Sequence, residues 1–102
     1  MARILISEPH ADIDALLRAV VERLGHETAA DEHGDVDLAV IEPGEEDGMR
    51  LARDLRARAV PFLFTSIYPP TPEALELEPV AYLVKPFPLA AIERALDAAM
   101  VS

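Results

Sequence analysis

Cysteine is absent from this chain of 102 residues, and only four glycines occur in it. Without cysteine neither a disulfide framework nor a thiolate metal site can form, which fits a reducing compartment, and we expect the protein in the cytoplasm. The glycines form no G-x-G-x-x-G motif, so the chain has no glycine-rich loop of the kind that cradles phosphates. These absences exclude disulfide-stapled domains and weigh against the common nucleotide-binding sites.

Basic residues are also few: nine lysines and arginines face 19 aspartates and glutamates, for a formal charge of -10. Nucleic-acid phosphates would be repelled from most of such a surface, so a protein partner or a small ligand is expected instead. Apolar runs are only a few residues long, and the N-terminus lacks the basic start, apolar middle and cleavage site of a secretory signal. We therefore expect no nucleic-acid partner and no membrane segment.

With 51% hydrophobic residues, the chain is long enough for one domain, residues 1–102, and too short for two. Short apolar runs predict strands over residues 3–7, 26–30, 37–41, 61–66 and 80–85. Apolar residues at helical spacing, with Gly25 ending the first helix and Thr71 capping the third, predict helices over residues 13–24, 46–58, 72–77 and 89–100. Strands that alternate with helices predict an α/β domain with a parallel sheet and right-handed crossovers.

Polar side chains stand at the carboxyl ends of four predicted strands: Glu8, Glu42, Ser66 and Lys85. Lys85 is the only lysine in the chain, and Pro86 stops the apolar run that carries it. In open α/β sheets ligands bind beyond the carboxyl ends of the strands, where these side chains would meet. Two acids, a hydroxyl and an ammonium are groups that together bind a divalent cation and a phosphoryl group.

With these residues the chain resembles the receiver domain of response regulators, the CheY-like family of two-component signal transduction. The resemblance extends over nearly the whole chain and is carried by four segments: Arg3-Ile4-Leu5-Ile6 and Asp37-Leu38-Ala39-Val40-Ile41, each before an acid, Pro61-Phe62-Leu63-Phe64-Thr65-Ser66, and Tyr82-Leu83-Val84-Lys85-Pro86-Phe87. It implies a single flavodoxin-like domain with a five-stranded parallel sheet of order 2-1-3-4-5, flanked by helices. It also implies a phosphorelay role, with Lys85 facing the phosphate, Ser66 following the phosphoryl group and Tyr82 as the switch aromatic. The Lys85-Pro86 bond is expected to be cis, as in that family.

The chain departs from that family where the chemistry takes place. The phosphoacceptor position holds Glu42 in place of aspartate, and its extra methylene moves the carboxylate outward by about 1.5 Å, which in-line transfer tolerates poorly. The acidic pair of the metal site is reduced to Glu8-Pro9, so Glu8 is interpreted as a relic, and neither Mg²⁺ nor another cofactor is expected. We interpret the chain as a degenerate pseudo-receiver, not an enzyme, in which Glu42 pairs with Lys85 and supplies part of the negative charge of a phosphate.

A third departure is a missing helix between the second and third strands, where only residues 31–36 remain. A crossover between parallel strands usually takes a dozen residues or more, so one face of the sheet near strands one and two is expected to be uncovered. An apolar patch of that kind favours a homodimer or a complex with a kinase, an output protein or a regulatory protein. The surface of the last two helices and the last strand is the competing interface.

Other interpretations stay open from the sequence. Glu42 is either a phosphate mimic or an inert acid at a strand end, and Ser66 and Tyr82 are either switch residues or ordinary packing residues. The chain is alternatively a phosphorylatable receiver with an unconventional site, or a flavodoxin-like domain that binds a small anion or nucleotide in the strand-end crevice. The histidines, His10 beside Glu8 among them, are expected to have helix-start, surface or loop roles without a metal.

Overall fold

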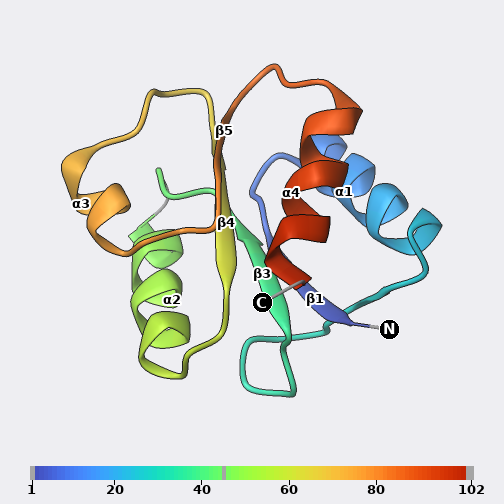
Figure 1. Cartoon of the computed structure of the whole chain (residues 1–102), viewed down its shortest axis with the longest axis horizontal. Coiled ribbons are helices and arrows are strands. Elements are labelled where there is room, and N and C mark those ends of the chain that lie inside the picture. Colours follow the sequence, from blue (N-terminus) through green and yellow to red (C-terminus); the bar gives the residue numbers. More distant parts are fainter. Residues whose placement is uncertain (1, 45, 101–102) are drawn as a thin grey trace.

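The computed structural model describes residues 2–44 and 46–100, which form one α/β domain (Figure 1). Its elements, in chain order, are β1 (Arg3–Ser7), α1 (Ala11–Arg23), β2 (Glu27–Thr28), β3 (Leu38–Ile41), α2 (Glu46–Ala57), β4 (Phe62–Ser66), α3 (Pro72–Glu76), β5 (Tyr82–Val84) and α4 (Leu89–Met100). The five strands are parallel and lie in the order β2-β1-β3-β4-β5. The predicted sheet, its order and its parallel direction are therefore confirmed.

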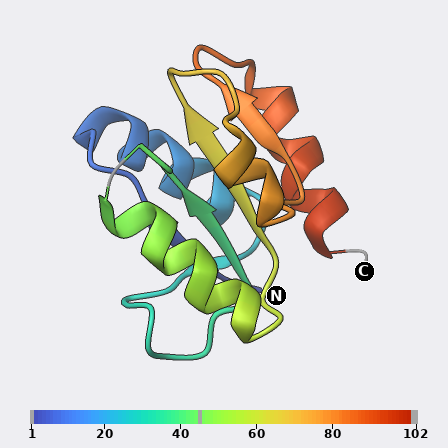
Figure 2. The same ribbon diagram turned by 90° about the vertical axis from the view of Figure 1, so that its left-hand side faces the viewer.

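Helices cover both faces of the sheet, with α1 and α4 on one side and α2 and α3 on the other (Figure 1). Figure 2 turns α2 and α3 toward the viewer, in front of the central strands. The period of two along each strand sends alternate side chains into two separate cores. Under α1 and α4 the strands contribute Ile4, Ile6, Leu38, Val40 and Leu63, and on the opposite face they contribute Leu5, Ala39, Ile41, Phe62 and Phe64.

Local sequence signals set several of the element ends. Gly25, at a φ of 87°, follows the last turn of α1, where a left-handed residue ends a helix at low cost. The Thr71 hydroxyl accepts a hydrogen bond of 3.2 Å from the Ala74 amide and caps α3, whose first residue is Pro72. The edge strands are shorter than predicted, because β2 pairs with β1 only at Glu27 and Thr28 and β5 ends at Val84. The Lys85-Pro86 bond is cis, as expected.

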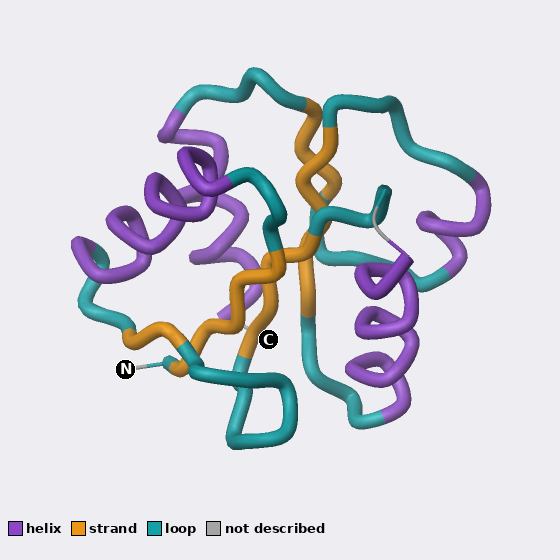
Figure 3. The backbone as a smooth tube through the Cα atoms, turned by 180° about the vertical axis from the view of Figure 1, so that it is seen from behind, coloured by secondary structure: helices purple, strands orange, loops and turns teal. Residues whose placement is uncertain are grey.

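The segment between β2 and β3 holds no helix: residues 29–37, all of them described, form turns and irregular backbone, as expected. Figure 3 shows this segment from behind as the loop at the bottom of the molecule. Ala29 and Val36 turn inward and join the core beneath α2, where Leu5 of β1 is only 7% exposed. The loop itself therefore covers the face of the sheet that was expected to be open.

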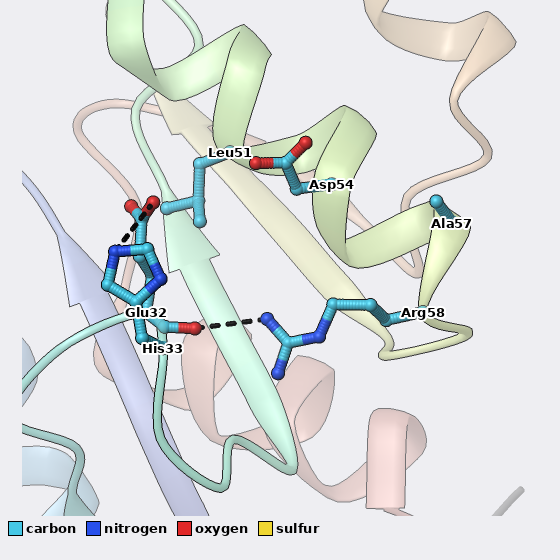
Figure 4. Close-up of a pocket in the computed structure, with 6 residues that line it drawn as sticks. All are labelled: Glu32, His33, Leu51, Asp54, Ala57 and Arg58. Atoms are coloured by element: carbon cyan, nitrogen blue, oxygen red, sulfur yellow. Dashed lines mark hydrogen bonds and ion pairs between the residues drawn. The ribbon is translucent and has the colours of Figure 1, made fainter.

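Polar contacts to α2 hold this loop in place. Arg50 of α2 donates two hydrogen bonds to the Glu32 carboxylate, at 3.0 and 3.1 Å. Arg58, just after α2, donates to the backbone carbonyl oxygen of Glu32, and Figure 4 shows its side chain reaching across a cleft of about 330 Å³ to that atom. The expectation of an uncovered apolar patch near strands one and two is wrong, because a two-residue β2 leaves little area to cover and the loop fills it.

The large apolar side chains that do remain exposed lie elsewhere on the surface. They are Leu16, Ile67, Tyr68, Leu75, Val80, Val84 and Leu89. In residues 2–44 and 46–100, no helix combines the length and the apolar character that a membrane crossing needs.

Candidate functional site

The ion pair at the carboxyl edge of the sheet joins side chains from three strand ends. Glu8 follows β1, Glu42 follows β3 and Lys85 follows β5. The Lys85 Nζ lies 2.5 Å from Glu8 Oε1 and 3.1 Å from Glu42 Oε2. The expected pair between Glu42 and Lys85 is present, and Glu8 joins it as a second carboxylate.

All three side chains of this cluster, the lysine cluster, are buried, with 7% of Lys85, 1% of Glu8 and 7% of Glu42 exposed. Burial alone would lower the pKa of Lys85, because water no longer solvates the ammonium. The hydrogen bonds and charges of Glu8 and Glu42 outweigh that effect and raise the pKa of Lys85 above its usual value. Lys85 therefore stays charged, and two carboxylates share one ammonium.

The carboxylate oxygens that do not face Lys85 also have partners. Glu42 Oε1 accepts a hydrogen bond of 2.8 Å from the Gly44 amide. Glu8 Oε2 lies 3.0 Å from His10 Nδ1 and accepts a weaker bond, at 3.3 Å, from the His10 amide. Each of the four carboxylate oxygens is thus engaged with a protein donor, so the two acids are fixed in orientation.

His10 was assigned by sequence reasoning to a helix start or the surface, and its link to Glu8 was missed. It does precede α1, but its side chain caps no helix amide and contacts Glu8 instead. The two residues are separated by only Pro9 in a turn, and that i, i+2 spacing in a non-helical segment is the signal that could have indicated the contact.

The close approach of α2 to the end of β3 positions Glu42. A Cβ atom on Gly48 would overlap the backbone carbonyl oxygen of Glu42, and it would also crowd the Ile41 side chain at 3.3 Å. Only glycine leaves room for the helix at that distance. The first turn of α2 therefore packs directly on the Glu42 backbone, while the Glu42 amide donates to Ser7 across to β1 at 2.9 Å.

The side chains of Ser66 and Tyr82 contact a loop, residues 67–71, while the Ser66 backbone carbonyl accepts a hydrogen bond of 2.7 Å from the Lys85 amide. The buried Ser66 hydroxyl accepts a 3.1 Å hydrogen bond from the Tyr68 amide. The Tyr82 hydroxyl donates to the Tyr68 carbonyl oxygen at 3.0 Å, and its ring packs edge-on against Phe64. Both side chains that the resemblance named as switch residues thus fasten one loop at Tyr68.

The described residues at this edge do not fit a magnesium ion. Magnesium takes several oxygen ligands in near-octahedral geometry. Pro9 offers no side-chain oxygen, the oxygens of Glu8 and Glu42 are engaged by protein donors, and Lys85 fills the space between them. Among the residues that the structure describes, no group of three or more histidine, aspartate or glutamate side chains is placed to hold a metal ion.

No protein-family model matches the sequence, and no curated protein matches it. Solved structures do match in fold. A response regulator from Thermotoga maritima superposes with a TM-score of 0.83 at 15% identity, covering 100% of this chain and 99% of that one. A CheY-like receiver domain from Methylobacillus flagellatus gives 0.80 at 24% identity, with 97% and 98% covered.

An orphan response regulator of H. pylori is similar as well, with a TM-score of 0.79 at 15% identity, covering 97% of this chain and 96% of that one. At identities this low the likeness establishes the fold. The chain has the architecture of CheY-like receiver domains, with the sheet order and the helix placement of that fold, except for the loop in place of the helix between β2 and β3.

Proposed function

We propose that this receiver-fold chain is a non-catalytic signalling module of the two-component type, a pseudo-receiver that works by contact with another protein. The observation that carries the proposal is the double pairing of Lys85 with Glu8 and Glu42 inside the sheet edge. Two buried carboxylates already neutralise the charge of Lys85, so this ammonium requires no phosphoryl group as a counter-ion. A cytoplasmic location, expected from the composition, is part of the same proposal.

Glu42 is poorly placed as a phosphoacceptor. A nucleophile must lie in line with the transferred group, and a displacement of about 1 Å is enough to cost roughly 100-fold in rate. The Glu42 carboxylate is buried, and one of its oxygens is bound to Lys85 and the other to the Gly44 amide. The metal that would neutralise the charge of the phosphoryl group also lacks ligands here.

The charge balance of the lysine cluster supports the idea of a built-in phosphate mimic. A phosphoryl group brings a charge of roughly -1.5 to -2 at neutral pH. Glu8 and Glu42 together bring two negative charges to the same ammonium from fixed positions. We infer that the module stays in one signalling state, with Ser66 and Tyr82 fastening the loop at Tyr68 in that state.

The exposed apolar residues on α3, β5 and α4 form the surface we propose for the partner. Leu75 on α3, Val80 before β5 and Val84 on β5 are 52%, 41% and 43% exposed, and Leu89 begins α4. Apolar groups of this size at neighbouring elements favour burial against another protein. The partner is a kinase, an output or regulatory protein, or a second copy of this chain, in place of a dimer formed through the covered face near β1 and β2.

Chemical phosphorylation tests the proposal. The protein is incubated with Mg²⁺ and acetyl phosphate, and its intact mass is measured. The unmodified chain should gain no phosphoryl group. The matched control is the double variant P9D/E42D, which restores the acidic pair and the aspartate and is expected to gain phosphate in a Mg²⁺-dependent way. Phosphorylation of the original chain that is lost in E42A would contradict the proposal and establish a working receiver.

A further inference from the structure

A cleft of about 370 Å³ opens beside the lysine cluster, between α2, α3 and the loop that follows β4. We call it the Arg53 cleft, because Arg53 of α2 supplies its one cationic side chain. Its apolar lining includes Met49, Pro69 and the Tyr82 side chain. The volume lies at the lower end of the range of small-molecule sites, which are mostly apolar with a few polar groups for orientation.

Arg53 differs from the other arginines of its region. Arg50 pairs with Glu32 and Asp54, Arg56 pairs with Glu78, and Arg58 donates to backbone carbonyls. Within the described part of the chain, Arg53 makes no ion pair and no hydrogen bond. In a protein with 19 acidic residues, a guanidinium that faces a cleft without an acid partner is available to an anion.

The Ser66 hydroxyl adds a second donor to the same cleft. It accepts a hydrogen bond from the Tyr68 amide, so its own hydrogen remains free to donate. Glu73 of α3 lines the cleft as well and lies outside ion-pair distance of Arg53. Its negative charge opposes ligands with several charges, nucleotides among them, and favours a single anionic group.

We propose that the Arg53 cleft binds a small, singly charged organic anion. Its carboxylate or phosphodiester head lies on the Arg53 guanidinium, and its apolar body lies against Met49 and Tyr82. The cleft shares Ser66 and Tyr82 with the edge of the sheet that carries the lysine cluster, so an occupant contacts the side chains that fasten the loop at Tyr68. Ligand binding would then replace phosphorylation as the input; this regulatory part rests on the proposed function, whereas the binding site does not.

Amide NMR with a simple probe tests the site. The ¹⁵N-labelled protein is titrated with benzoate and, separately, with the neutral benzamide. Benzoate should shift amides around Arg53, Tyr68 and Ala74 with a Kd on the order of 1 mM, the affinity expected for a ligand of so few atoms. Benzamide should bind at least several-fold more weakly, because the charge-assisted hydrogen bonds to the guanidinium are missing.

R53Q should weaken benzoate binding roughly tenfold or more, the usual effect of losing a hydrogen bond between charged groups. R94Q is the matched control: it makes the same charge change on α4, away from the cleft, and should leave binding unchanged. The absence of localised shifts, equal binding of benzamide, or unchanged binding by R53Q would each overturn the proposal. Shifts on adding Mg²⁺ and beryllofluoride would instead contradict the proposed function and leave the cleft standing, so the two failures are distinguishable.

Discussion

Lys85 is held in place by the carboxylates of Glu8 and Glu42, and removing any one of the three charges should lower the stability of the fold. Taking an ammonium and two carboxylates out of water is unfavourable, and their mutual attraction and hydrogen bonds compensate for it only while all partners are present. The four engaged carboxylate oxygens satisfy that condition. Removing the lysine alone should therefore be far more harmful to stability than removing all three charges together.

K85M should lower the free energy of unfolding by about 3–5 kcal/mol at neutral pH, because Glu8 and Glu42 are left buried without a counter-ion. Urea denaturation followed by circular dichroism measures the change. The triple variant K85M/E8Q/E42Q is the control, since it carries no uncompensated charge and should recover a large part of the loss. Equal stability of the single and triple variants would show that the charges of this cluster do not govern its energetics.

Sequence reasoning located Glu8, Glu42, Ser66 and Lys85, because each follows an apolar run whose end a parallel sheet brings to one edge. It missed the contact of His10 with Glu8, although their i, i+2 spacing in a non-helical segment could have indicated it. The unpaired state of Arg53 could not be predicted, because it depends on side-chain directions in three dimensions and no periodicity carries that information. Along α2 the arginines differ in their contacts: Arg53 lines a cleft without an acid partner, whereas Arg50 and Arg56 are paired with acids.

At the scale of elements, helix α2 sets the position of Glu42, because its first turn packs against the end of β3. G48A should destabilise the fold by about 1–3 kcal/mol, because the new Cβ meets backbone atoms of Glu42 that cannot move aside easily. This loss is expected although alanine has the higher helix propensity. Thermal and urea unfolding measure it, with G34A as the control, since a Cβ there has no neighbour closer than 4.0 Å. Unchanged or raised stability of G48A would mean that α2 is not packed this closely on Glu42.

The stability contributed by the loop between β2 and β3 should depend on pH. The hydrogen bond from Arg50, with the charge of Arg50, lowers the pKa of the Glu32 carboxyl below its usual 4.5 against the opposing effect of partial burial. A carboxyl with a lowered pKa in the folded state contributes stability above its unfolded pKa and loses it as pH falls through the folded value. This contribution should thus be full near pH 7 and fade below about pH 4.5.

The variant E32Q tests this pH dependence directly, because glutamine does not titrate. The variant should be less stable than the original chain at pH 7, and the difference should shrink at an acid pH at which the Glu32 carboxyl, whose folded-state pKa lies below 4.5, becomes protonated. Chemical denaturation at the two pH values measures it. A difference that stays constant between them would show that the ion pair with Arg50 does not hold the loop.

The helices were predicted well because hydrophobic periodicity and caps such as Thr71 are local signals. The covering role of residues 29–37 was not predicted, because it depends on hydrogen bonds to this loop from Arg50 of α2 and from Arg58, which follows α2. The absence of a helix between β2 and β3 was predicted correctly from the shortness of that segment, but the prediction that one face of the sheet is uncovered was wrong. Short edge strands such as β2 need less cover than a full-length strand would.

At the scale of the whole molecule, the receiver fold is retained while the site that would receive a phosphoryl group is filled by its own side chains. The cores on both faces of the sheet are complete within the described chain, so the site changes are not accompanied by a loss of architecture. The strand-end edge of this receiver fold is therefore occupied by the paired charges of Glu8, Glu42 and Lys85.

The most direct measurement is the amide NMR spectrum of the unmodified protein before and after addition of Mg²⁺ and beryllofluoride, a mimic of a phosphoryl group. We predict no localised shifts, because Lys85 is already paired with Glu8 and Glu42 and the described residues of this edge offer no free set of oxygen ligands to the metal. Saturable shifts at Glu42, Ser66 and Lys85 would contradict the account and show a receiver site that still responds to phosphate.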